Sequence, residues 1–277
     1  MSMSSDDLFV PPGHFYSPIF LPGDSYSKIS APTESEIPMN AQSQIELLRA
    51  ILPLGRKFPD TPTDTFFYYS SNDQYGDGDA FIFSGIIQYL QPAKVIEIGS
   101  GFSTAVLIDT LLSANLSTKV VAIDPFPERL EQLLVNKESL MTNDVSITIL
   151  PQKVQEVDTS LFSTLAPGDI LFIDSSHVSK TGSDVNFELF QIIPKLKSGV
   201  WVHIHDMFWP FEYPEAWIQQ GRSWNENYIV RAFLTGNSKI QIRFFQQYLF
   251  NEHNSEWASV IEKGVHNPGG GLWIEIL

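Results

Sequence analysis

Cysteine is absent from the 277 residues of this sequence. That absence excludes disulfide bonds, thiolate metal sites and a cysteine nucleophile together. Positive charge is scarce as well, because 17 lysines and arginines stand against 32 aspartates and glutamates, for a formal net charge of -15. Such a surface repels phosphate backbones and anionic membranes, so nucleic acid is disfavoured as a partner.

Long apolar runs are also missing, since no stretch of eighteen or more uncharged apolar residues occurs. We therefore expect no membrane partner. The first residues, MSMSSDDLF, carry no positive charge followed by an apolar stretch, which disfavours a secretory signal. The sequence predicts a soluble, cytoplasmic protein.

The composition allows one large α/β core, because 43% of the residues are apolar and 13% are aromatic. Residues 1–40 are rich in Pro, Ser and Gly and hold the aromatic cluster GHFYSPIF without a lasting period. They predict an irregular N-terminal arm that packs on the body or covers the active site. Residues 41–277 are expected to form a single catalytic domain.

Short apolar runs alternate with longer amphipathic segments through most of the chain, as in crossover units around a parallel sheet. The predicted strands are Val95–Ile98, Val120–Ile123, Ile147–Leu150, Ile170–Ile173, Val200–Ile204, Ile240–Phe245 and Leu272–Ile276. The predicted helices are Ser43–Leu52, Asp79–Leu90, Ser103–Ala114, Glu128–Val135, Asp184–Leu196 and Asn225–Leu234. No helical period is found between the last two strands, which indicates an antiparallel closing pair.

The most informative local pattern is VIEIGSGFST at residues 95–104, a buried strand that passes through two glycines into a helix. Gly99 and Gly101 allow a sharp turn and a close approach to a ligand. Glu97 stands at the end of the strand, where it can meet a polar or cationic group of that ligand. Ser103 can cap the open amides of the helix.

A dinucleotide fingerprint would require a third glycine at position 104, where Thr104 stands. The next strand ends in AIDPF with Asp124, at the distance where an acid binds ribose hydroxyls in nucleoside-binding α/β folds. The pattern favours an adenosine ligand without phosphates over NAD.

These motifs resemble the class I S-adenosylmethionine-dependent methyltransferases, and within them a small-molecule branch with an N-terminal arm. The resemblance rests on PPGHFYSPIF, YYSSNDQYGDGDAF, IEIGSGFST, FIDSSHVSKTGSDVNFELFQIIPKLKSG, HIHDMFWPFEYPEAW and GGGLWIEIL. It implies a Rossmann-like α/β fold, with helices on both faces of a seven-stranded, mostly parallel sheet that carries an antiparallel C-terminal strand.

The resemblance implies S-adenosylmethionine as cofactor. Its methionine part would be held by Glu97, Gly99 and Gly101, and its ribose by Asp124. Many relatives carry an acid for the adenine amine after the third strand, whereas this chain has PQKVQEV with Lys153 near that position. Tyr75 and Asp79, ahead of the first sheet strand, are further candidates to reach the carboxylate and amine of the cofactor.

Candidates for the chemistry lie where the fourth and fifth strands end, at the edge where open α/β sheets bind ligands. They are Asp174 and His177 in IDSSH, and His205 and Asp206 in HIHDMF. Either histidine could take a proton from an acceptor or could serve only as an orienting hydrogen-bond partner. His203, one step deeper in its strand, is interpreted as structural.

A divalent metal is the disfavoured alternative at this edge. Asp174, His205 and Asp206 would be its ligands, by likeness to methyltransferases that hold magnesium with acids at these two strand ends. Magnesium prefers oxygen ligands, and His205 stands where those relatives have an acid. We therefore expect no tightly bound metal.

Aromatic residues in two loop segments are candidates for the acceptor pocket. Trp209, Phe211 and Tyr213 in FWPFEYPEAW are the expected walls, with His14 and Tyr16 of the arm as a lid. Core packing is the competing explanation for such residues.

The sequence thus predicts methyl transfer to a small-molecule acceptor, with oxygen as the favoured atom and nitrogen as an open alternative. The NPPY-like tetrapeptide of nucleic-acid amino methyltransferases is missing after the fourth strand, where SSHV stands. Two alternatives remain: a nucleoside- or S-adenosylmethionine-binding protein without catalysis, and an NAD-dependent oxidoreductase. A homodimer is compatible with the sequence.

Overall fold

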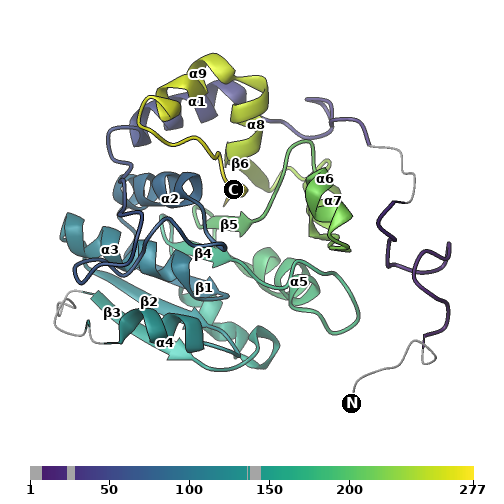
Figure 1. Ribbon diagram of the computed structural model, residues 1–277, viewed down its shortest axis with the longest axis horizontal. Coiled ribbons are helices and arrows are strands. Elements are labelled where there is room, and N and C mark those ends of the chain that lie inside the picture. The colour runs from purple at the N-terminus through teal and green to yellow at the C-terminus, as the bar shows by residue number, and fades with distance from the viewer. Residues whose placement is uncertain (1–7, 24–28, 136, 138–144) are drawn as a thin grey trace.

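A seven-stranded sheet with the order β3-β2-β1-β4-β5-β7-β6 forms the centre of the computed structural model (Figure 1). The structure describes residues 8–23, 29–135, 137 and 145–277. The strands are β1 (Lys94–Ile98), β2 (Thr118–Ile123), β3 (Val145–Leu150), β4 (Ile170–Ile173), β5 (Trp201–His205), β6 (Ile240–Phe245) and β7 (Gly271–Ile276).

The first five strands are parallel, and β7 lies antiparallel between β5 and β6. The predicted Rossmann-like α/β fold with an antiparallel C-terminal strand is confirmed. The central strands β1 and β4 bury side chains on both faces, because both faces of the sheet are covered there. On β1, Val95 packs into one core cluster and Ile96 into the other, and both are fully buried.

Helices cover both faces of the sheet, as Figure 1 shows. They are α1 (Ala41–Ile51), α2 (Asp77–Leu90), α3 (Phe102–Ala114), α4 (Glu128–Leu134), α5 (Asp184–Phe187), α6 (Glu215–Gln219), α7 (Glu226–Leu234), α8 (Gln246–Glu252) and α9 (Asn254–Ile261). Helices α1, α2, α3, α8 and α9 contribute to the core of one face, and α5 and α7 to that of the other. None of the described helices is long and apolar enough to cross a membrane.

The prediction of one continuous helix over Asp184–Leu196 is wrong. Helix α5 gives way to a π-helical turn at Glu188–Ile192 and then to a short 3-10 turn at Ile193–Lys195. Pro194 has no N–H to donate to a preceding carbonyl, so a regular α-helix cannot continue through it. The widened turn leaves Glu188 buried beneath the loop that follows β4.

The absence of helix between the last two strands was also wrongly predicted, because α8 and α9 lie there. Few of their residues are buried, chiefly Leu249, Trp257 and Val260. The apolar pattern is therefore too sparse to indicate a helix. Contacts of α8 with α1 and β7 supply the packing that holds the segment.

The order of the strands positions the site. After β3 the chain returns to the other side of β1, so β1 and β4 are neighbours whose connections leave in opposite directions. Ligands of open α/β sheets bind outside the carboxyl ends of the strands at such a point. Ile98 pairs with Ile123 on β2 and with Ile173 on β4, so the residues that follow all emerge at one edge.

Candidate functional site

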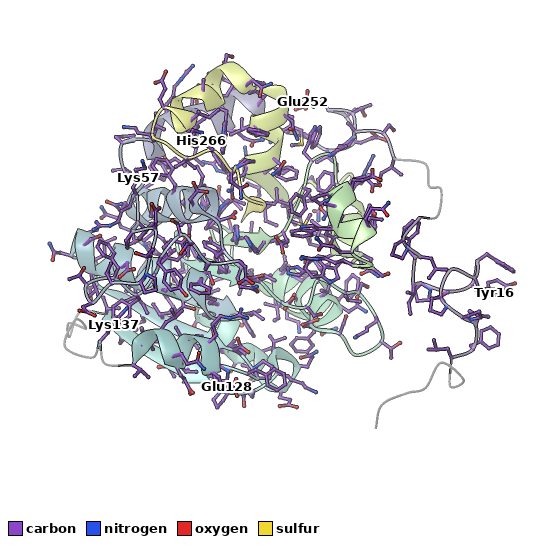
Figure 2. The ribbon with its side chains drawn as sticks, viewed as in Figure 1. Tyr16, Lys57, Glu128, Lys137, Glu252 and His266 are labelled. Carbon is purple, nitrogen blue, oxygen red and sulfur yellow. The ribbon has the colours of Figure 1, made fainter. Side chains whose placement is uncertain are left out.

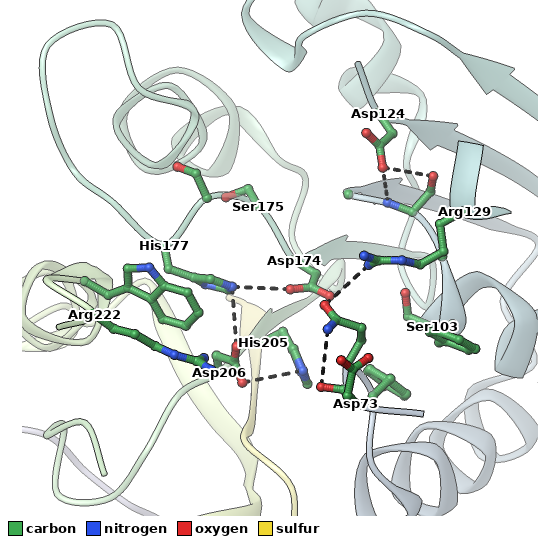
Figure 3. A pocket seen from close by; sticks show the side chains of 18 of the residues that line it. Asp73, Ser103, Asp124, Arg129, Asp174, Ser175, His177, His205, Asp206 and Arg222 are labelled. Atoms are coloured by element: carbon green, nitrogen blue, oxygen red, sulfur yellow. Dashed lines mark hydrogen bonds and ion pairs between the residues drawn. The ribbon is translucent and has the colours of Figure 1, made fainter. Parts of the chain in front are cut away.

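Two adjoining cavities open at the carboxyl edge of the sheet. The larger has a volume of about 640 Å³ and extends from the loop after β1 to the segment between α6 and α7. The smaller, of about 450 Å³, lies toward β7. Tyr75, His205, Asp206 and Trp217 line both. Figure 3 shows the labelled carboxylates, histidines and arginines of the larger cavity gathered around one space.

The loop after β1 forms one end of the larger cavity. Gly99 has a φ of 82°, and a Cβ there would lie 1.9 Å from the carbonyl oxygen of Asp174. Only glycine therefore allows the loops after β1 and β4 to approach so closely. Asp124 fixes the next residue, because its Oδ2 accepts from the Ser100 N–H at 2.8 Å and from the Ser100 hydroxyl at 3.1 Å. The structure thus brings Gly99, Gly101, Ser103 and Asp124 together as lining residues.

Glu97 does not line either cavity; it lies beneath the loop and is almost fully buried. Its carboxyl accepts hydrogen bonds from the hydroxyls of Ser103, at 2.6 Å, and Thr104. Burial raises the pKa of Glu97 to about 8, although these two hydrogen bonds oppose the rise. Glu97 therefore braces the glycine loop, and any contact with a ligand would pass through its neighbours.

His177 lies among three carboxylates at the opposite end of the larger cavity. Its Nδ1 is 2.8 Å from an oxygen of Glu226, and its Nε2 is 3.5 Å from oxygens of both Asp174 and Asp206. Figure 3 shows the ring of His177 directed at Asp174 and Asp206. The buried bond to Glu226 leaves Nε2 as the nitrogen that meets the cavity.

The charges of this cluster are coupled. Burial lowers the pKa of His177, but the bonds to Asp174 and Glu226 outweigh burial and hold it well above its ordinary value. Burial would raise the pKa of Asp174, but the positive charges of His205 and His177 hold it at about 2. Burial raises the pKa of Asp206, and nearby positive charges oppose that rise. These shifts favour a protonated His177 beside an ionised Asp174.

The first turn of α7 fixes the backbone around His177. The carbonyl of His177 accepts from the N–H groups of Asn225 and Glu226, both at 3.2 Å. His177 and Asp206 have positive φ values of 60° and 53°, which non-glycine residues adopt only where the surroundings enforce them. The sequence prediction missed Glu226, because nothing in a helix-starting NEN tripeptide distinguishes a buried orienting acid from a solvated one.

His205 lies between the two cavities. Its Nε2 is 3.6 Å from Asp206, and its ring centroid is 5.0 Å from that of Tyr75. Among the described residues, neither the Nδ1 of His205 nor the hydroxyl of Tyr75 has a hydrogen-bond partner, although both atoms are buried. His203, one step deeper, lies between Phe172 and Trp273, and burial holds its pKa well below the ordinary value. A neutral ring packed in this way agrees with the structural role expected of His203.

Asp79, a predicted cofactor contact, lines only the smaller cavity. Its carboxylate accepts from the N–H of Gly270 at 2.9 Å and from the amide of Gln246 at 3.2 Å. Burial raises its pKa to about 6. Asp79 thereby fixes the loop before β7. Lys153 lies at neither cavity, and Arg129 lies at the glycine loop instead.

The described residues contain no group of three His, Cys, Asp or Glu side chains arranged to hold a metal ion. Asp174, His205 and Asp206, the set expected for a metal, do lie at one cavity. The Nε2 atoms of His177 and His205 lie 3.5 Å or more from the oxygens of Asp174 and Asp206.

Trp209, Phe211 and Tyr213, the expected walls of the acceptor pocket, line neither of the two cavities. Phe211 is fully buried and packs on Phe245. The indole of Trp209 donates to Glu252 at 2.8 Å, on the far side of the loop. Tyr213 is buried, and its hydroxyl accepts from a backbone N–H of α7. These side chains anchor the loop after β5 to the helices behind it.

Other aromatic residues line the two cavities. Trp217 and Trp224 line the larger cavity, and Phe208 and Trp217 line the smaller one. The ring of Trp224 lies 4.5 Å from that of His177, and Arg222 stacks on both indoles. Trp224 stands in a loop with no periodic pattern, so the sequence offered only the local density of tryptophan as a signal.

His14 and Tyr16, the predicted lid, do not line the cavities either. Tyr16 is 67% exposed, and Figure 2 shows it at the outer edge of the molecule. The arm is attached where the N–H of Phe20 donates to the hydroxyl of Ser223 at 3.3 Å. The later arm residues Ile37 and Met39 are buried in the core. The arm thus packs on the body at its end, while Phe15 and Tyr16 of its aromatic cluster are exposed.

Comparison with known proteins agrees with this arrangement. Residues 96–207 match a family model described as a methyltransferase domain, from β1 to just beyond β5. The match and the strand order confirm the expected resemblance to class I methyltransferases. A protein of Archaeoglobus fulgidus, described as uncharacterized, is 29% identical over 167 residues, which are 56% of this chain and 73% of that protein.

Among solved structures, the chain is similar to the Podospora anserina methyltransferase PaMTH1 with bound S-adenosylhomocysteine. The identity is 12%, the TM-score is 0.44, and the match covers 85% of this chain and 88% of that one. It is also similar to an O-methyltransferase of Bacillus cereus, at 13% identity and a TM-score of 0.43, over 85% of this chain and 91% of the other.

Proposed function

We propose that this class I methyltransferase transfers the methyl group of S-adenosylmethionine to an oxygen atom of a small-molecule acceptor. The observation that carries the proposal is the single cavity that joins the glycine loop and Asp124 to His177 and two indoles. Its first end has the groups that suit an adenosyl ligand. Its second end has a candidate base beside aromatic walls.

The residues at the first end fit an adenosyl sulfonium better than a dinucleotide. The Gly101 N–H donates to the Thr104 hydroxyl at 3.1 Å, so the start of α3 is capped by its own side chain. A diphosphate would require those N–H groups. Asp124 supplies carboxylate oxygens for ribose hydroxyls, and the ionised Asp174 favours a cation nearby. The buried hydroxyl of Tyr75 supplies a hydrogen bond that no described residue uses.

Bound S-adenosylmethionine would supply an activated methyl group on a good leaving group. The protein then mainly has to align the acceptor with that methyl group and exclude water. Trp217 and Trp224 would hold a small, planar or apolar acceptor. The Nε2 of His177 would take the acceptor proton after the ring has released its own proton to solvent, and Asp174 would stabilise the positive charge that returns to the ring.

Oxygen is the favoured atom because a neutral hydroxyl must lose a proton to become a good nucleophile, and a histidine with carboxylates on both sides suits that task. We also propose that residues 41–277 form the catalytic domain, and that residues 1–40 form an N-terminal arm that packs on the body or covers the active site. Asp206 and His205 would shape the site between the two cavities.

Calorimetry with S-adenosylmethionine, S-adenosylhomocysteine and NADH tests the cofactor. We expect S-adenosylmethionine and S-adenosylhomocysteine to bind and NADH not to bind. Binding of NADH alone would replace this proposal with an oxidoreductase. Transfer of a labelled methyl group into panels of phenols, sugars and carboxylic acids tests catalysis. A His177→Gln variant should bind the cofactor normally and lose most transfer. Cofactor binding without transfer to any acceptor would favour a binding protein.

A further inference from the structure

Arg222 lies over the rings of two adjacent indoles at the wall of the larger cavity. Its guanidinium carbon is 4.2 Å from the ring centroid of Trp217 and 5.0 Å from that of Trp224. All three residues line the cavity, and the two indoles meet edge to face with centroids 5.3 Å apart. Figure 3 shows Arg222 on the same side of the site as Asp206.

The end of α6 builds this arrangement. Gly221 has a φ of 80°, which ends the helix and turns the chain back. The Arg222 N–H then donates to the carbonyl of Trp217 at 3.1 Å, which brings the arginine over that indole. The side-chain Nε of Arg222 donates to Gln220 at 3.1 Å. That bond orients the guanidinium and leaves its terminal nitrogens available to a ligand.

The charge of Arg222 is not neutralised by an ion pair with any residue that the structure describes. Within residues 8–23, 29–135, 137 and 145–277, no carboxylate oxygen lies within 4.0 Å of its nitrogens. Asp206 is near enough for Arg222 to oppose the rise of its pKa, although His205 and His177 oppose that rise more strongly. If Arg222 served only to balance the charge of Asp206, the two side chains would form an ion pair. A chain with a net charge of -15 also offers other acidic partners to an arginine.

We propose that Arg222, Trp217 and Trp224 form a subsite for an oxyanion, a carboxylate or phosphate group, on the acceptor. The inference rests on the proposed function and names the chemical class of its substrate. A guanidinium presents parallel N–H donors that match two oxygens of such a group, and flanking indoles hold it in one orientation. The ring of Trp224 also contacts His177, so the subsite lies one indole away from the candidate base.

The test uses the full chain saturated with S-adenosylhomocysteine and follows the indole N–H signals of Trp217 and Trp224 by NMR. The probes are 3,4-dihydroxybenzoate, its neutral analogue 3,4-dihydroxybenzamide, and inorganic phosphate. Arg222→Gln removes the charge, and Arg222→Lys retains it without the forked donors. Arg49→Gln, an exposed position on α1, changes the net charge equally and serves as the matched control.

The benzoate, or phosphate, should shift both indole signals, and the benzamide should bind at least about tenfold more weakly. Arg222→Gln should abolish that preference, Arg222→Lys should retain part of it, and Arg49→Gln should leave it unchanged. Response to benzoate alone would assign a carboxylate, and response to phosphate alone a phosphate. Equal binding of benzoate and benzamide, a preference that survives Arg222→Gln, or no shift with any probe would overturn the proposal.

Failure of the proposed function is distinguishable from failure of the subsite. If S-adenosylhomocysteine does not bind in calorimetry, the proposed cofactor is wrong. The same probe titration on the protein alone still reports whether Arg222 selects anions.

Discussion

Substitution of Gly99 by alanine tests the close approach that forms the cofactor end of the cavity. The left-handed backbone at φ 82° costs an alanine about 1–2 kcal/mol. The new Cβ would lie 1.9 Å from the carbonyl oxygen of Asp174, a backbone atom, so the loops after β1 and β4 must separate. That movement strains the 2.8 Å bond from the Asp174 N–H to Ile98, worth about 1 kcal/mol. We expect the free energy of unfolding to fall by about 2–3 kcal/mol in total.

Gly168→Ala is the matched control, because Gly168 has a φ of 85° and no heavy atom within 4 Å of its added Cβ. The free energy of unfolding of Gly168→Ala should fall only by the cost of placing an alanine in the left-handed backbone. Denaturant unfolding of both variants should therefore differ by at least about 1 kcal/mol. Calorimetry should show weakened S-adenosylmethionine binding for Gly99→Ala alone. Equal destabilisation of the two variants would refute the reasoning.

Three further predictions concern acids of the site. Glu226→Gln should lower kcat about tenfold and leave cofactor affinity unchanged, because it weakens the orientation of His177; a change in affinity instead would contradict this. Glu97 keeps its proton up to a pKa of about 8 in the folded state, against an ordinary 4.5, so stability should fall as pH rises between these values. Glu97→Gln should remove that slope and gain about 3 kcal/mol at pH 7 in denaturant unfolding. Asp124→Asn should weaken cofactor binding about tenfold in calorimetry, with a smaller loss refuting a ribose contact.

The strands could be predicted because their pattern is local. Buried parallel strands are continuous apolar runs, and each predicted run lies within one or two residues of its observed position. The segment 184–196 failed because Pro194 and the buried Glu188 change the helical geometry, which periodicity does not report. The segment 246–261 failed because tertiary contacts hold helices that bury few residues.

The site was predictable where residues follow strand ends directly. Gly99, Asp124 and Asp174 reach one edge through strand register alone. The acceptor end depends on how the segment after β5 folds, and this cannot be read from a list of aromatic residues. There the loop buries Phe211 and instead presents Trp224, which lies far along the chain.

A crystal structure of the complex with S-adenosylhomocysteine tests the central claim most directly. The ribose should lie at Asp124, the methionine part at the loop of Gly99 to Ser103, and the sulfur toward Asp174 and His177. A ligand bound elsewhere, or a cavity that stays empty at saturating concentration, would contradict the account.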